Sequence, residues 1–251
     1  MKSLILGIVQ GLTEFLPVSS SGHLVIIKHW LNFQSEGTIM EATLHFATLL
    51  AIIIFFRKKL LDYVTKEKIL TIIVGTIPIA LLGILFKDKI ELLFNNYLLV
   101  TVTLSLTGVL LFISRNPKEN KEELDLKCAL IIGIAQALAI TPGISRSGAT
   151  VATALLLGVT RKKAFEFSFI LAIPALLGAF IINIPDIMGN NLNSAFSLLP
   201  GALAAFFSGL LALWIFYKLI VKKDLYFFSY YLWTVSAVSL FLLLFYQILP
   251  E

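Results

Sequence analysis

The sequence is poor in charge and in cysteine. Only 14% of its 251 residues are charged, and Cys128 is the single cysteine. One thiol excludes an intramolecular disulfide and a metal cluster built on several cysteines. The low charge accompanies a hydrophobic content of 58% and a mean hydropathy of +0.92. These values exclude an ordinary soluble domain and indicate an integral membrane protein.

Long apolar runs are abundant. A helix needs about 20 residues to cross a bilayer, and six runs reach or approach that length. They are Ala42–Phe56, Ile69–Phe86, Tyr97–Ser114, Phe165–Asn183, Leu198–Tyr217 and Leu225–Leu249. Because backbone polar groups inside a bilayer must be satisfied internally, each run predicts a transmembrane helix. We expect an all-α polytopic membrane protein with a single membrane domain over residues 1–251.

Basic residues gather in four groups at the ends of the predicted helices. Fifteen of the 20 Lys and Arg residues fall in segments that six crossings place on one face, and four fall on the other. The fifteen are Arg57, Lys58, Lys59, Lys66, Lys68, Arg115, Lys118, Lys121, Lys127, Arg161, Lys162, Lys163, Lys218, Lys222 and Lys223. This bias predicts cytoplasmic basic loops and outside termini in the cell membrane. The net charge of +5 is thus a topology signal, and we expect no nucleic-acid partner.

The chain contains an internal repeat. A shift of 126 positions aligns Leu4–Val25 with Leu130–Val151 without a gap, and ten of the 22 positions are identical. The identical positions include Gln, Ser and Gly, which shared hydrophobicity does not explain. We expect repeat one to cover about residues 1–114 and repeat two about residues 127–249.

Each repeat begins with a helix that is too short to cross the membrane. Leu4–Leu16 extends roughly 20 Å at 1.5 Å per residue before Pro17 breaks it, and a second helix runs from the serines to about Leu31. The corresponding parts of repeat two are Ala129–Ile140, a break at Pro142–Gly143 and a helix to about Leu157. We expect two re-entrant helix–turn–helix pairs. Three crossings separate them, so they enter from opposite faces as an inverted-topology repeat, which often places a site near the midplane.

A cluster of polar residues lies in and beside the two turns. They are Gln10, Glu14, Ser19, Ser20, Ser21 and His23 in repeat one, and Ser145, Arg146, Ser147 and Thr150 in repeat two. Ser19 and Ser145 stand where N-caps belong. Two helix N-termini and an arginine that can grip phosphate in a bidentate manner suit a diphosphate.

Glu14, Ser20 and His23 together resemble a nucleophile with its base. Several structural alternatives remain open. Glu14 and Arg146 can form an ion pair between the repeats, the serines can bond across helices, and His23 can be a satisfied core residue. Buried charges in a membrane are costly and by default functional. His29 and His45 lack such polar neighbours, so we expect the first at the interface and the second in packing.

With these residues in view, the chain resembles the undecaprenyl-diphosphatase family, also known for bacitracin resistance. The resemblance rests on the segments QGLTEFLPVSSSGH, from Gln10 to His23, and PGISRSGAT, from Pro142 to Thr150. The family carries Glu or Gln at the first position. This chain has Gln10, so Glu14 is the only carboxylate of that motif.

The resemblance implies a membrane phosphatase that converts C55 undecaprenyl diphosphate to the monophosphate and recycles this lipid carrier for cell-wall synthesis. It implies catalytic roles for Glu14, His23, Arg146 and Ser20. Substrate-binding roles fall to Gln10, Ser19, Ser21, Ser145, Ser147 and Thr150.

The chemistry of these residues leaves alternatives open. Glu14 is an acid/base or the ligand of a divalent cation, Mg²⁺ or Ca²⁺, and no organic cofactor is expected. His23 attacks phosphorus or activates Ser20 or water. The expected partners are a polyprenyl diphosphate lipid and the membrane. The alternative function is a broken-helix transporter or flippase of a lipid carrier or anion.

Overall fold

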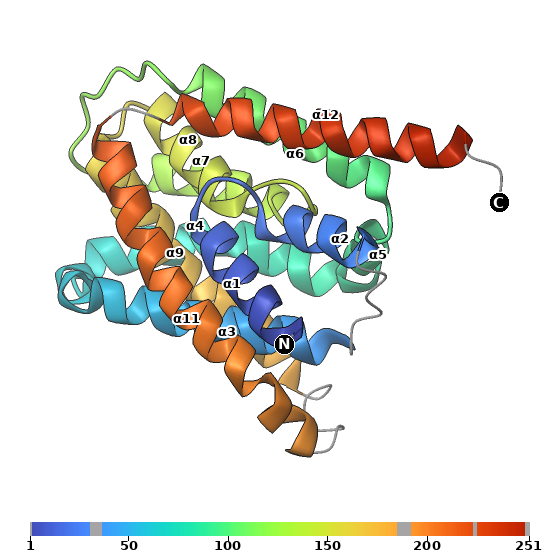
Figure 1. Cartoon of the computed structure of the whole chain (residues 1–251). Coiled ribbons are helices and arrows are strands. Elements are labelled where there is room, and N and C mark those ends of the chain that lie inside the picture. Colours follow the sequence, from blue (N-terminus) through green and yellow to red (C-terminus); the bar gives the residue numbers. More distant parts are fainter. Residues whose placement is uncertain (1, 31–36, 185–191, 223–224, 249–251) are drawn as a thin grey trace.

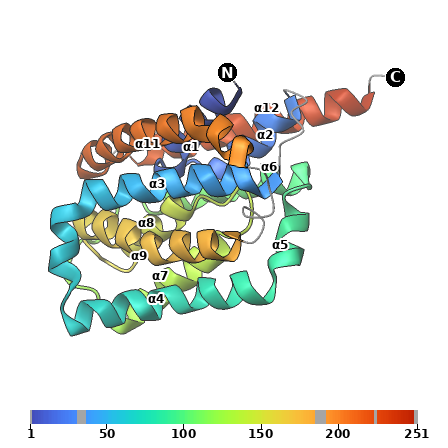
Figure 2. The same ribbon diagram turned by 90° about the horizontal axis from the view of Figure 1, so that it is seen from below.

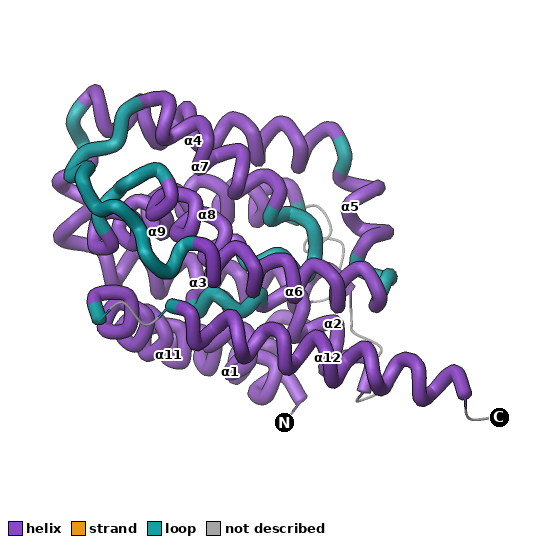
Figure 3. Tube along the Cα trace, turned by 90° about the horizontal axis from the view of Figure 1, so that it is seen from above, coloured by secondary structure: helices purple, strands orange, loops and turns teal. Residues whose placement is uncertain are grey.

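The computed structural model of the protein describes residues 2–30, 37–184, 192–222 and 225–248 (Figure 1). Within these residues the regular elements are helices and no strand is present (Figure 3). The elements are α1 (Lys2–Phe15), α2 (Ser20–Trp30), α3 (Gly37–Leu60), η1 (Leu61–Tyr63), α4 (Lys66–Leu85), α5 (Lys87–Leu93), α6 (Tyr97–Ile113), α7 (Leu126–Leu138), α8 (Arg146–Leu156), α9 (Arg161–Ile182), α11 (Leu192–Val221) and α12 (Tyr226–Ile248). The predicted all-α fold is confirmed.

Five of the described helices are long and apolar enough to cross a membrane on their own. They match five of the six predicted crossings to within a few residues and correspond to α3, α4, α9, α11 and α12. Leu249, the predicted end of the last crossing, lies outside the described residues. The remaining crossing is α6, which has 17 residues and reaches the required length only together with α5. The two are bent by 91°, and Figure 2 shows α5 as a steep connection between α4 and α6. A multi-pass helical membrane protein is therefore confirmed.

Both predicted short helix pairs are present. The chain breaks between α1 and α2 around Pro17 and between α7 and α8 around Pro142. Leu31, the predicted end of the second helix, lies outside the described residues. Each break contains one residue in the left-handed backbone region, Ser19 with φ of 69° and Gly143 with φ of 90°. Glycine adopts this region freely, whereas a non-glycine residue there must be held by its surroundings.

Helices of the two halves approach each other closely at glycines in equivalent positions of the repeat. A Cβ on Gly7 of α1 would lie 2.1 Å from the backbone oxygen of Gly201 in α11. A Cβ on Gly133 of α7 would lie 2.3 Å from the backbone oxygen of Gly75 in α4. Gly7 and Gly133 are 126 positions apart, and so are Gly75 and Gly201. Each half therefore packs its short first helix on a long helix of the other half. This pattern supports the duplication, while its inversion across a membrane remains a prediction.

An aromatic core fixes the end of α1 from which the site is built. In the layered arrangement of Figure 2, α9 lies between α3 and α4 and contacts both. The rings of Phe15 in α1 and Phe169 in α9 have centroids 5.7 Å apart, and those of Phe165 and Phe216 in α11 are 5.5 Å apart. All four side chains are buried. Because Phe15 follows Glu14 directly, this packing also fixes the carboxylate.

Three of the predicted basic segments lie at the same end of the molecule. Lys59, at the end of α3, and Lys163, at the start of α9, lie 4.0 Å and 3.7 Å from the carboxylate of the buried Glu166. Arg161 donates a hydrogen bond of 3.2 Å to the backbone oxygen of Arg115, which follows α6. One basic end is what the predicted topology requires, and its assignment to the cytoplasm remains a prediction.

The glycine contacts between halves lead to a stability prediction. We expect Gly133→Ala to lower the thermal unfolding midpoint in detergent, because its Cβ meets backbone that cannot rotate away. Such overpacking costs about 1–3 kcal/mol. The matched control is Gly178→Ala in α9, where a Cβ meets nothing within 4 Å. Equal midpoints for the two variants would contradict the close approach of α7 and α4.

Candidate active site

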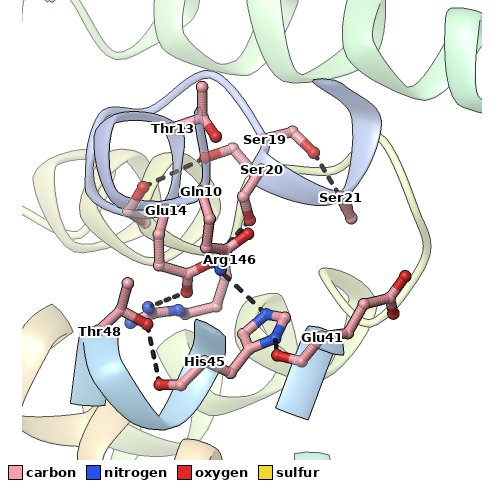
Figure 4. Close-up of polar contacts among 12 residues, drawn as sticks. Gln10, Thr13, Glu14, Ser19, Ser20, Ser21, Glu41, His45, Thr48 and Arg146 are labelled. Carbon is pink, nitrogen blue, oxygen red and sulfur yellow. Dashed lines mark hydrogen bonds and ion pairs between the residues drawn. The ribbon is translucent and has the colours of Figure 1, made fainter. Parts of the chain in front are cut away.

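The polar residues of both turns meet at the carboxylate of Glu14 (Figure 4). Its Oε1 accepts a hydrogen bond of 2.9 Å from Nη2 of Arg146. Its Oε2 accepts hydrogen bonds from the hydroxyl of Ser20 at 2.6 Å and from Nε2 of Gln10 at 3.1 Å. Glu14 is only 8% exposed, so these bonds form away from bulk water. Residues of α1, α2 and α8 thus satisfy one buried carboxylate.

Of the two terminal nitrogens of the Arg146 guanidinium, only one has a hydrogen-bond partner among the described residues. Nη2 binds Glu14, and Nη1 is buried without a hydrogen-bond partner among the described residues. The ring of Phe169 lies beneath it at 5.8 Å. Glu14 and Arg146 therefore do form the ion pair between the repeats, and Nη1 of Arg146 is left without an acceptor in the described part of the chain. A buried arginine with free donors beside a carboxylate is suited to bind an anion such as phosphate.

The N-terminal ends of α2 and α8 lie beside this pair. Ser19 accepts a hydrogen bond of 3.2 Å from the backbone N–H of Gly22, and Ser145 accepts one of 3.1 Å from Gly148, so both predicted N-caps are confirmed. The hydroxyl of Ser21 accepts a bond of 3.4 Å from the backbone N–H of residue 143, which links the two turns. Helix N-termini carry partial positive charge and stabilise bound anions.

These residues line one cavity of about 440 Å³. Its polar lining consists of Glu14, Ser19, Ser20, Ser21, Glu41, His45, Thr76, Lys87, Glu91, Ser145, Arg146 and Asn183. Much of the remaining wall is apolar and comes from α4, α5 and α9, including Ile79, Ala80, Gly83, Gly178 and Phe180. The volume is within the range of pockets that hold small ligands. The cavity thus joins the polar cluster around Glu14 and Arg146 to an apolar wall.

His45 belongs to the site, so our expectation that it only packs was wrong. Its Nε2 lies 3.7 Å from Oε2 of Glu14, and its side chain is 35% exposed. Its Nδ1 lies 2.8 Å from the backbone oxygen of Glu41, which also lines the cavity. A signal was present in the sequence, because Glu41 and His45 are four positions apart and therefore share a face of a predicted membrane helix. The side chain of His29 lies outside the described part of the chain.

Three residues predicted to bind substrate do not line the cavity. Gln10 is buried and donates to Glu14. The hydroxyl of Ser147 donates to a backbone oxygen of the first turn at 3.2 Å, and that of Thr150 donates to the backbone oxygen of Arg146 at 2.8 Å. These side chains hold the residues that do face the cavity. Their contacts with substrate stay a prediction.

His23 also points away from the cluster. Its Nδ1 lies 2.8 Å from the backbone oxygen of Ser19, and its Nε2 lies 2.7 Å from the hydroxyl of Tyr231 in α12. The spacing of Ser20 and His23 had favoured a hydroxyl–imidazole pair, but the structure pairs the Ser20 hydroxyl with Glu14 instead. Glu14, Ser20 and Arg146 are therefore brought together, and His23 is not.

The described residues contain no group of three or more His, Cys, Asp or Glu side chains arranged to hold a metal ion. Glu14 was the candidate ligand, and both of its oxygens accept hydrogen bonds from the protein. Magnesium needs only one or two protein carboxylates when substrate phosphates supply the other oxygens. The residues present therefore fit a cation that arrives with its phosphate, and not a fully protein-bound one.

The fold and the site define a polytopic helical membrane protein with a composite polar site, to which both halves contribute. The comparison with known proteins identifies the family. The family described as bacitracin resistance protein BacA matches residues 3–238, and the chain belongs to this family.

Relatives in other organisms carry the name undecaprenyl-diphosphatase. The protein of Thermosipho melanesiensis is 43% identical over 94% of this chain and 96% of its own. That of Carboxydothermus hydrogenoformans is 39% identical over 96% of both chains, and that of Methanobrevibacter smithii is 37% identical over 95% of both. The resemblance in the two motifs therefore extends over nearly the whole chain.

The buried Glu14–Arg146 pair leads to a prediction about stability. Removing one partner leaves an uncompensated buried charge, which costs about 3–5 kcal/mol. We expect Glu14→Gln and Arg146→Met each to lower the thermal unfolding midpoint more than the double variant does. Unfolding of the four proteins in one detergent measures this. A double variant that loses the sum of the two single effects would show that the charges are not coupled.

Proposed function

We propose that this protein hydrolyses undecaprenyl diphosphate to undecaprenyl monophosphate and inorganic phosphate. The observation that carries this proposal is a serine hydroxyl bonded to a buried carboxylate, beside an arginine with unused donors. The family and the names of its members agree with this chemistry. The cavity agrees as well, because its polar part suits a diphosphate and its apolar wall suits the hydrocarbon attached to it.

Ser20 is the nucleophile in the mechanism that this geometry favours. Its hydroxyl donates to Glu14 over 2.6 Å, so Glu14 can take the proton while the oxygen attacks the terminal phosphorus. A bond forms between the Ser20 oxygen and phosphorus. The bridging oxygen–phosphorus bond breaks, and the prenyl monophosphate leaves with the electron pair. Water then attacks the phosphoserine, and the Ser20 oxygen leaves and recovers the proton from Glu14.

Arg146 and the two helix ends stabilise the charge that develops on the transferring phosphoryl group. The free Nη1 of Arg146 and the hydroxyls of Ser19, Ser21 and Ser145 supply donors in a site shielded from water. Preorganised donors of this kind supply a large part of the rate enhancement in such sites. His45, beside Glu14, adds a polar group from α3 to the same wall.

The apolar wall holds the part of the prenyl chain next to the diphosphate. Gly83 in α4 and Gly178 in α9 both line the cavity. A Cβ on Gly178 would meet nothing within 4 Å, and one on Gly83 would meet only Ile140 at 3.7 Å. Neither glycine is required by helix packing, so the space beside them is available to a lipid that enters from the bilayer.

Glu14 would hold a divalent cation, Mg²⁺ or Ca²⁺, that comes with the diphosphate, and the cation would supply neutralisation of phosphate charge. The chain's own donors, in particular Arg146, orient the phosphates and do not depend on the cation for their placement.

The protein works in the cell membrane, with its basic end in the cytoplasm and the site open to the outer face. There it returns the lipid carrier to cell-wall synthesis, and by removing the diphosphate it confers bacitracin resistance. A transporter needs an anion site but no activated hydroxyl. The bond between Ser20 and Glu14 therefore favours the enzyme over the transporter.

The test of this function is phosphate release from undecaprenyl diphosphate by detergent-purified protein, with and without Mg²⁺ or Ca²⁺. We expect wild type to release phosphate and Arg146→Ala to reduce kcat by about 10²–10³-fold, as for other lost transition-state donors. Ser20→Ala removes the nucleophile itself, so we expect a larger loss of kcat. The control is Ser236→Ala in α12, which removes a hydroxyl that bonds to the backbone of Thr101 in α6. A folded wild type without activity under these conditions would refute the phosphatase.

The apolar wall gives a prediction about chain length. Gly178→Leu fills space beside the diphosphate, so we expect kcat/KM to fall for undecaprenyl diphosphate and much less for a five-carbon prenyl diphosphate. Gly178→Ala serves as the matched control of smaller volume. An equal loss for both substrates would place the prenyl chain elsewhere.

A further inference from the structure

We propose that His23 and Tyr231 are positioning residues, which hold the backbone of Ser19 so that the next residue, Ser20, keeps its bond to Glu14. This inference rests on the proposed function, since it concerns the geometry of the same nucleophile. It gives His23 a role other than attack on phosphorus and gives Tyr231, on α12, a role in the reaction.

Both ring nitrogens of His23 are engaged. Nδ1 lies 2.8 Å from the backbone oxygen of Ser19, and a carbonyl oxygen can only accept, so Nδ1 carries the proton. In a neutral ring Nε2 then accepts the hydrogen bond of 2.7 Å from the hydroxyl of Tyr231. The residue is only 9% exposed and does not belong to the cavity lining. Neither nitrogen is free to attack phosphorus or to take the proton of Ser20.

The backbone that His23 holds is strained. Ser19 has a φ of 69°, the only positive value among the described non-glycine residues. Its backbone oxygen accepts from the ring of His23 and, at 3.2 Å, from the backbone N–H of the same residue. Strained conformations of this kind persist only where the surroundings fix them. The imidazole is a contact that fixes this one.

The second repeat supplies an internal comparison. The position that corresponds to Ser19 is Ser145, whose φ is an ordinary −74°. The position that corresponds to His23 is Ala149, which has no polar side chain. The strained backbone and the imidazole therefore occur together in one copy and are absent together from the other. In the strained copy the next residue is Ser20, the proposed nucleophile, and in the unstrained copy it is Arg146.

Tyr231 connects this turn to α12. Its ring stacks on that of His23 with centroids 5.7 Å apart and an interplanar angle of 3°. The neighbouring Tyr230 instead contacts the rings of Phe112 and Trp233. Loss of the Tyr231 hydroxyl leaves Nε2 without its donor and loosens the ring that holds Ser19. We therefore expect an effect on kcat, with KM preserved because Arg146 does not depend on this contact.

The test compares variants of His23 by phosphate release from undecaprenyl diphosphate. Asparagine places an N–H donor near the position of Nδ1 but is neither a nucleophile nor a base. His23→Asn should therefore retain much of the wild-type kcat, whereas His23→Ala should lose it. Tyr231→Phe should lower kcat about 10-fold at unchanged KM, the effect of one lost hydrogen bond. Tyr230→Phe should match wild type.

Two results would overturn the inference. One is a His23→Asn variant that folds with the wild-type unfolding midpoint and is as inactive as His23→Ala, because that outcome requires the imidazole itself. The other is a ¹⁵N spectrum of the selectively labelled protein in which the neutral ring of His23 carries its proton on Nε2. Inactive wild type would count against the proposed function instead, and the spectrum still decides the inference.

Discussion

A buried ion pair between Glu14 and Arg146 joins the two repeats at the centre of the site. A lone charge buried in a membrane protein is very costly, so each residue requires the other. Glu14 comes from the first repeat and Arg146 from the second, and the equivalent positions, Ile140 and Ser20, carry no charge. The two copies have therefore become complementary, and neither can form the site alone. Hydrogen bonds from Ser20 and Gln10 complete the environment of the carboxylate.

The surrounding fold places these groups within hydrogen-bond distance. Close approach at Gly7 and Gly133 allows each short helix to pack against a long helix of the other half, and Phe15 anchors the end of α1 in the aromatic core. The breaks after α1 and α7 then bring two helix N-termini to the same cavity. Packing thus fixes the site, which contains the unsatisfied donor of Arg146 and the strained backbone of Ser19.

Much of this arrangement could be predicted from the sequence, because helix length, proline breaks and N-caps are local properties. The duplication also predicted that polar residues of both turns would meet. The directions of the side chains were harder to predict, because spacing shows which residues share a helix face but not what that face contacts. Ser20 and His23 are three positions apart, yet the former bonds to α1 and the latter to α12. His45 was missed because it approaches Glu14 from α3, outside both motifs.

In the proposed mechanism Ser20, bonded to Glu14, attacks the terminal phosphorus. Rapid acid quenching of the wild-type protein during turnover of undecaprenyl diphosphate labelled in the terminal phosphate tests this step. We expect an acid-stable label on Ser20, located by mass spectrometry and absent from Ser20→Ala. Turnover without any covalent label would assign the attack to water. An acid-labile label on His23 would contradict both the nucleophile and the positioning role.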